Sequence, residues 1–163
     1  MAFCWSGKKI FLSTGEGRIK ILSYPAFEPI LKRTYEDKPF ELSAHTSSCL
    51  TCTLSPTGRY LATGGSDSII TLWDTATWTC PRTLIDMVGP VRSISFSFDG
   101  SFVLGGSDEG SGLEISHAES GEHIHTVKTT GPCPVVEWHP SRYWLAYTDF
   151  AGLKIVGIEE NKK

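Results

Sequence analysis

The sequence lacks any continuous apolar segment of about 20 residues, which is the length that a helix needs to cross a bilayer. Its N-terminus also lacks the basic start, the apolar run and the small-residue cleavage site of a secretory signal. We therefore expect a chain that neither spans a membrane nor enters the secretory pathway.

Cysteine is too scarce and too scattered to indicate a disulfide framework. The chain has five cysteines, an odd number, whereas small disulfide-rich domains carry an even set at close spacings. They are Cys4, Cys49, Cys52, Cys80 and Cys133. This pattern favours a reducing intracellular compartment.

An excess of positive charge is also missing. Lys and Arg together number 15 against 18 Asp and Glu, which gives a formal net charge of −3. No Lys or Arg occurs between Arg92 and Lys128, although several carboxylates do. The charge supplies no bulk attraction to nucleic acid or anionic lipid, and the acidic stretch is a poor phosphate binder.

Complete catalytic or metal-binding motifs are absent as well. Cys49 and Cys52 have the spacing of half a zinc site, but in a strand residues three apart point to opposite faces. His123 and His125 are expected to share a strand face, yet no third ligand is evident near them. We find no nucleophile elbow, no paired carboxylates and no phosphate loop. The sequence predicts a protein that is not an enzyme and holds no cofactor.

What the sequence does contain is one unit repeated four times. The clearest copy, Ser55–Asp74, reads as a turn, an apolar run, a Gly/Ser/Asp turn and an alternating run, which is typical of a β-hairpin. The turn glycine Gly58 recurs 51 residues earlier as Gly7 and 42 residues later as Gly100. Each copy follows another short apolar run, and no helical period competes with this pattern.

Short strands repeated at about 40 to 45 residues predict an all-β propeller with about four blades. The expected blades are residues 1–34, 45–85, 90–128 and 133–158, with an insertion loop at 35–44 and a tail at 159–163. We expect outer strands at 29–34, 80–85 and 123–128, and a last blade without its outer strand. Such a partial ring exposes two apolar faces and one strand edge, so we expect it to dimerise, aggregate or be poorly stable.

The second copy resembles a WD40 repeat at the residues that define the motif. They are a loop histidine, a strand threonine, a turn aspartate and a strand-end tryptophan, namely His45, Thr63, Asp67 and Trp73. We expect the Trp73 indole to donate to Thr63, and the Thr63 hydroxyl to bond His45, which in turn bonds Asp67. The same trio resembles a hydrolase triad, but a structural role is favoured because Thr63 lies inside a strand.

Further segments resemble the THO complex subunit 3 family, and specifically its C-terminal half. They are Leu22-Ser23-Tyr24-Pro25, Leu72-Trp73-Asp74 and Trp138-His139-Pro140. The resemblance implies a nuclear scaffold in an assembly that couples transcription to messenger-RNA packaging and export. It implies as partners the other THO subunits and export factors, contact with RNA through the complex, and no membrane or small-molecule substrate.

Other binding functions stay open at this stage. The acidic stretch Asp108–Glu122 suits a reader of basic peptides such as histone tails in a different nuclear complex, whereas direct RNA binding is disfavoured by the charge. As exposed contact residues we predict Trp78, Arg92 and Arg142.

Overall fold

The computed structural model describes residues 1–30 and 39–157 and is built from antiparallel β-sheets. Three sheets have four strands and one sheet has three. This arrangement confirms the predicted all-β fold class, a partial propeller, and among the residues that the structure describes the last sheet has three strands. Within the described ranges, no helix is long and apolar enough to cross a membrane.

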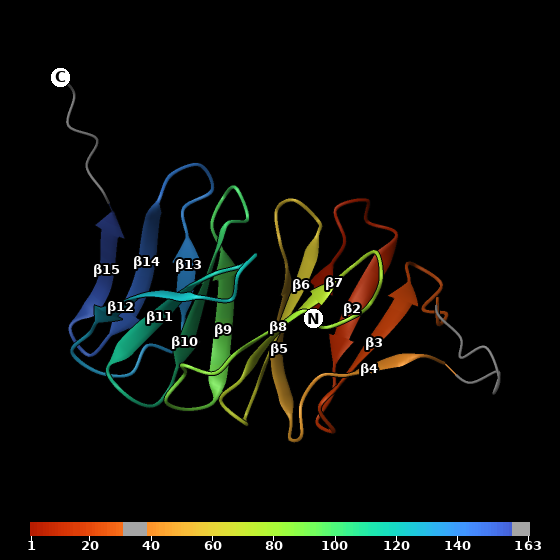
Figure 1. Ribbon diagram of the computed structural model, residues 1–163, viewed down its shortest axis with the longest axis horizontal. Coiled ribbons are helices and arrows are strands. Elements are labelled where there is room, and N and C mark those ends of the chain that lie inside the picture. Colours follow the sequence, from red (N-terminus) through yellow and green to blue (C-terminus); the bar gives the residue numbers. More distant parts are fainter. Residues whose placement is uncertain (31–38, 158–163) are drawn as a thin grey trace.

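The sheets follow one another along the chain and lie side by side along the long axis of the molecule (Figure 1). The first sheet contains β1 (Ala2–Phe3), β2 (Lys9–Ser13), β3 (Arg18–Ser23) and β4 (Glu41–Ser43). The second contains β5 (Cys49–Leu54), β6 (Tyr60–Gly65), β7 (Ile70–Asp74) and β8 (Arg82–Leu84). The third contains β9 (Val91–Phe96), β10 (Phe102–Ser107), β11 (Gly112–His117) and β12 (His123–Lys128). The fourth contains β13 (Val136–Trp138), β14 (Trp144–Asp149) and β15 (Gly152–Gly157).

Apolar side chains fill the spaces between neighbouring sheets, because each strand places alternate residues on each face. The first and second sheets bury Phe11, Ile19, Ile21, Leu42, Cys49, Cys52 and Leu61. The second and third bury eleven residues that include Ala62, Leu72, Val91 and Val103. The third and fourth bury Leu104, Leu113, Ile115, Cys133, Val136, Trp138, Leu145 and Tyr147. The hydrophobic core is therefore divided into layers between blades.

The outer strand of the first sheet differs from our prediction. We expected it at 29–34 and an insertion loop at 35–44, but β4 lies at Glu41–Ser43 and pairs with Arg18–Lys20. Pro29 makes only an isolated bridge to Leu22, and residues 31–38 lie outside the described ranges. Leu42 explains the difference, because this side chain is 1% exposed and pairs with Ile19. The polar residues before Leu42 led us to extend the loop too far.

Candidate functional site

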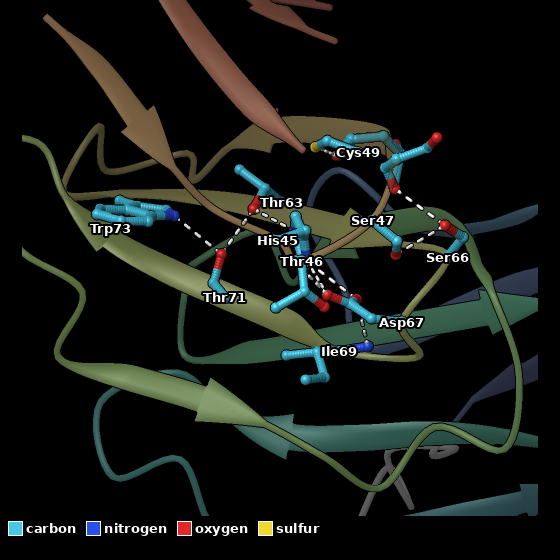
Figure 2. Close-up of polar contacts among 12 residues, drawn as sticks. His45, Thr46, Ser47, Cys49, Thr63, Ser66, Asp67, Ile69, Thr71 and Trp73 are labelled. Atoms are coloured by element: carbon cyan, nitrogen blue, oxygen red, sulfur yellow. Dashed lines mark hydrogen bonds and ion pairs between the residues drawn. The ribbon is translucent and has the colours of Figure 1, made fainter. Parts of the chain in front are cut away.

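A chain of polar side chains runs through the second sheet and ends at the turn between β6 and β7 (Figure 2). His45 Nδ1 lies 3.0 Å from Asp67 Oδ1, and His45 Nε2 lies 2.8 Å from Thr63 Oγ1. Thr63 Oγ1 is 2.6 Å from Thr71 Oγ1, which accepts a hydrogen bond of 2.9 Å from Trp73 Nε1. The structure therefore brings together all four residues that the sequence pattern singled out.

One link in this chain differs from our expectation. Trp73 donates to Thr71 and not to Thr63. Thr71 pairs directly with Thr63 across β6 and β7, and Trp73 follows two residues later on the same strand face. Thr71 is the residue that sequence reasoning missed, although its place two residues before Trp73 was the available signal.

One assignment of protons satisfies all the side-chain donors in this series of hydrogen bonds. If neutral His45 carries its proton on Nδ1, that N–H donates to Asp67 and Nε2 accepts from Thr63. Thr63 then accepts from Thr71, which accepts from Trp73. The His45 side chain is 0% exposed, so the hydrogen bonds offset the cost of burying these groups.

The geometry gives this chain of hydrogen-bonded side chains a structural role, not a nucleophilic one. Thr63 is 0% exposed and its hydroxyl contacts both His45 and Thr71, so no substrate reaches it. The backbone N–H groups of Ala44 and His45 donate to the Gly17 carbonyl of the first sheet. The polar chain therefore fixes the loop that joins the first two blades.

Two β-bulges change the faces that we assigned to candidate metal ligands. The register of β5 shifts between Cys49 and Thr51, and both Cys49 and Cys52 lie in the same buried cluster, not on opposite faces. Burial and the neighbouring Cys52 raise the pKa of Cys49 to about 12, so its thiol is protonated at neutral pH. These two side chains pack as small apolar groups.

The second bulge lies between Ile115 and Ser116, which pair with His125 and His123. His123 Nε2 lies 2.8 Å from Glu114 Oε2, which also accepts from Thr126. The bulge removes the strict alternation that would place both imidazoles on one face. Across the described ranges, no group of three or more His, Cys, Asp or Glu is placed to hold a metal ion.

The three predicted contact residues have different environments. Trp78 is only half-exposed and packs against Phe11 of the first sheet, with ring centroids 6.0 Å apart, so our expectation of an exposed ring was wrong. Arg92 is exposed but engages Asp108 at 2.6 Å. Arg142 is exposed and lies 5.0 Å from the ring centre of Trp144.

The exposed tryptophan is Trp5, which sequence reasoning placed in a strand. Its side chain is 70% exposed, and its indole N–H donates to the Ser55 carbonyl at 2.8 Å. This bond holds the ring between the first two sheets. The signal was the Ser6-Gly7 turn directly after Trp5, because a strand that ends there leaves the tryptophan on the rim.

The acidic stretch does not form one patch. Asp108 lies at the end of β10, whereas Glu119 follows β11, and β11 separates them by its full length. Both carboxylates are engaged within the chain, Asp108 by Arg92 and Glu119 by Arg59 at 2.6 Å. These two carboxylates are therefore already paired with arginines of the same chain.

Carboxylates also link the blades to one another. Glu119 accepts from Tyr60 of the second sheet at 3.0 Å, and Asp99 accepts from Tyr143 of the fourth-sheet region at 2.8 Å. The hydrogen bond from Tyr60, together with the charge of Arg59, lowers the pKa of Glu119. Each contact ties a turn of the third sheet to a neighbouring blade.

The comparison with known families agrees with this geometry. Residues 37–74 and 78–111 match the family model described as WD domain, G-beta repeat. The chain thus carries WD40 repeats in these two segments. The two matched segments cover the second sheet, with the polar chain, and the start of the third.

Individual WD40-repeat proteins match over more of the chain. THO complex subunit 3 of Arabidopsis thaliana is 32% identical over 171 residues, which cover 99% of this chain and 51% of that protein. WD repeat-containing protein AAC3 of Dictyostelium discoideum is 39% identical over 143 residues, covering 87% of this chain and 28% of that protein. The chain thus spans about half the length, or less, of these two relatives.

A solved structure supports the fold alone. The β-propeller domain of Cps50 (Swd1) from Myceliophteria thermophila superimposes with a TM-score of 0.80 over 96% of this chain and 52% of that chain. Sequence identity in the superposition is 21%. The match extends beyond the two segments recognised by the family model, so the degenerate first and fourth repeats have the same architecture.

Proposed function

We propose that this chain is a non-catalytic scaffold that acts as a subunit of a nuclear THO-type assembly, which couples transcription to messenger-RNA packaging and export. The observation that carries the proposal is its similarity to THO complex subunit 3 of Arabidopsis thaliana along 99% of the chain. The buried polar chain supports a framework role, because its groups are consumed in holding blades together. RNA is contacted through the other subunits.

We further propose Arg142 as a contact residue of this scaffold. Its guanidinium is exposed and rests on Trp144, so it presents a fixed positive charge at the rim of the fourth sheet. Arg92 is exposed too, but its charge is neutralised by Asp108. The pair provides a comparison between an available and an occupied arginine on one molecule.

The test is to purify the tagged chain from nuclease-treated nuclear extract and to identify what accompanies it by mass spectrometry. We expect the other THO subunits in near-stoichiometric amounts, reduced recovery with Arg142→Ala and unchanged recovery with Arg92→Ala. Recovery of histone-associated complexes, or of chaperones alone, would reject the assignment to a THO-type assembly.

A further inference from the structure

Turns at corresponding places in the four sheets line one pocket. Each of these turns joins the first and second strand of its sheet, and the pocket that they share has a volume of about 300 Å³. Its walls include Trp5 from the first sheet, Pro56 from the second, Phe98 from the third, and His139 and Pro140 from the fourth. Neither β12 nor β15 contributes to it, so the pocket is formed by consecutive sheets and not by the outer strands.

Two aromatic rings of this pocket are accessible and yet held in place. Trp5 is 70% exposed, and its indole N–H donates to the Ser55 carbonyl at 2.8 Å. A Cβ at Gly58 would lie 3.7 Å from the Trp5 ring, so the ring rests on the turn of the second sheet. Phe98 is 36% exposed and packs on Tyr143, with ring centroids 4.9 Å apart. The rings are thus positioned before any partner binds, which lowers the entropic cost of binding.

Glu137 supplies the charge of the pocket. It is exposed, and of the residues that line the pocket it is the only Asp, Glu, Lys or Arg. Its Oε1 accepts from the Ser95 hydroxyl at 2.9 Å, and the Ser95 oxygen accepts from the backbone N–H of Trp138 at 2.9 Å. Across residues 1–30 and 39–157, no lysine or arginine is paired with Glu137. The carboxylate is therefore oriented by one neutral hydrogen bond and has acceptor capacity left.

The other polar groups of the same turns do not cancel this charge. His139 Nδ1 accepts the backbone N–H of Ser141 at 3.2 Å, as a neutral imidazole does. Arg142 follows in the same turn, but its guanidinium lies 5.0 Å from the ring centre of Trp144 and does not line the pocket. The pocket therefore combines accessible aromatic faces with an unpaired negative charge, whereas Asp108 and Glu119 of the acidic stretch are paired with arginines.

We propose that this pocket receives an arginine side chain of a partner protein. A cation is attracted both to aromatic faces and to a carboxylate. The guanidinium group serves both because it is planar, stacks on rings and donates two parallel hydrogen bonds to a carboxylate, whereas the lysine ammonium is a strongly hydrated point charge. A volume of about 300 Å³ is at the lower end for ligand pockets, which suits one side chain. The proposal rests on the pocket and not on the proposed function, because it holds whichever assembly the partner belongs to.

Labelled peptides test the chemistry on the unchanged chain. We would measure fluorescence anisotropy of a fluorescein-labelled peptide in which glycine and serine flank a single arginine, at low salt, with the purified 163-residue chain. The matched peptides carry citrulline, which has nearly the shape of arginine without its charge, or lysine. We expect the citrulline peptide to bind at least about tenfold more weakly than the arginine peptide, because it loses the charge-assisted hydrogen bonds. The lysine peptide should lie between them. No measurable binding of the arginine peptide, or equal affinities for the arginine peptide and either matched peptide, would overturn the proposal.

Variants of the chain locate the binding. Glu137→Gln keeps the shape of the side chain and an acceptor for Ser95, so it should stay folded and weaken the arginine peptide about tenfold. Glu122→Gln removes an exposed carboxylate outside the pocket and should leave the affinity unchanged. Arginine-peptide binding that is as tight to Glu137→Gln as to the parent would overturn the site.

The aromatic wall has a matched pair of its own. Trp5→Leu should weaken the arginine peptide severalfold, because an aliphatic side chain offers no π-face to the guanidinium. Tyr24→Leu removes another aromatic ring of the first sheet, 44% exposed and outside the pocket, and should not change the affinity. The melting temperature of each variant verifies that it is folded. Equal affinities of folded Trp5→Leu and Tyr24→Leu proteins would contradict the role given to Trp5.

Discussion

At the scale of the residue, the second repeat derives its order from a buried hydrogen-bond chain that has no spare donor. Trp73, Thr71, Thr63, His45 and Asp67 each engage the next member. Loss of one member leaves its neighbours buried and unpaired, which costs more than the hydrogen bond itself contributes. This hydrogen-bond network is therefore sensitive to the loss of any one of its members.

Thr71→Val should lower the free energy of unfolding by about 1–3 kcal/mol, because it leaves the Trp73 indole and the Thr63 hydroxyl without their shared partner. Urea denaturation followed by tryptophan fluorescence measures the change. Thr53→Val is the control, since the Thr53 hydroxyl makes no hydrogen bond to any described residue. A Thr71→Val protein as stable as this control would show that Trp73 does not depend on Thr71.

Gly65→Ala should also destabilise the protein, by about 1–3 kcal/mol. A Cβ at Gly65 would lie 2.5 Å from both Asp67 Oδ1 and His45 Nδ1, so it would push apart the two groups that end the chain. Gly15→Ala is the matched control, because a Cβ there meets nothing within 4 Å. Thermal unfolding of both variants tests the difference, and equal melting temperatures would contradict it.

Asp99 gives a pH-dependent prediction. Partial burial opposes ionisation, but hydrogen bonds from Ser101, Ser97 and Tyr143 outweigh it and hold the pKa of Asp99 below its usual value. Because the folded-state pKa is depressed, the stabilisation is present above the unfolded value of about 3.9 and is lost as the pH falls through the folded value.

Asp99→Asn should therefore be less stable than the parent at pH 7, by about 1–3 kcal/mol, and the gap should narrow below about pH 4. Denaturation of the parent and the variant at pH 7 and at pH 3 measures both the loss of stability at pH 7 and its decrease in acid. Asp86→Asn, at an exposed position without a hydrogen-bond partner in the described ranges, serves as control. A gap that widens in acid would contradict the role given to Asp99.

At the scale of the element, β-turns and bulges decide how neighbouring sheets meet. The turn after β11 carries Glu119, which accepts from Tyr60 and is paired with Arg59 of the second sheet, while its carbonyl accepts from Arg82. One turn thus contacts the start of β6 and the start of β8, which lie at the same end of the preceding blade. The bulges in β5 and at β11–β12 determine which side chains enter the layers between sheets.

Glu119→Gln should lower the melting temperature, and the effect should shrink at high salt because part of it is an exposed ion pair. Glu122→Gln lies on the same turn, is exposed and has no side-chain partner among the described residues, so it should leave the melting temperature unchanged. Calorimetry at low and high salt compares the two. A decrease in melting temperature that does not depend on salt, or equal decreases for both variants, would contradict the role given to Glu119 in joining the second and third sheets.

Strand positions followed from the sequence where an apolar or alternating run is bounded by turn residues, as in β6 and β7. Alternation failed at Cys49 and at His123, because one extra residue in a strand reverses the faces that follow and leaves no mark in composition. The fourfold polar set was visible as a motif, yet Thr71 became evident only once β6 and β7 were paired. β4 was missed because three residues carry too short a pattern.

At the scale of the whole molecule, the sheets form a row in which each blade contacts the next (Figure 1). The chain spans about half of the length of THO complex subunit 3 of Arabidopsis thaliana. Trp5 and Arg142 are exposed, and neither residue belongs to the buried polar chain. The proposed contacts can therefore be tested by mutation without disturbing that polar chain.

The measurement that tests the scaffold assignment most directly is cross-linking mass spectrometry of the tagged chain in nuclease-treated nuclear extract. The exposed amines of Lys8 and Lys20 belong to the first sheet and that of Lys128 to the third sheet, so together they report on two parts of the molecule. We predict cross-links from at least one of them to other THO subunits, at spectral abundance comparable to links within this chain. Cross-links confined to subunits of an unrelated complex would contradict the assignment to a THO-type assembly while leaving the WD40 fold intact.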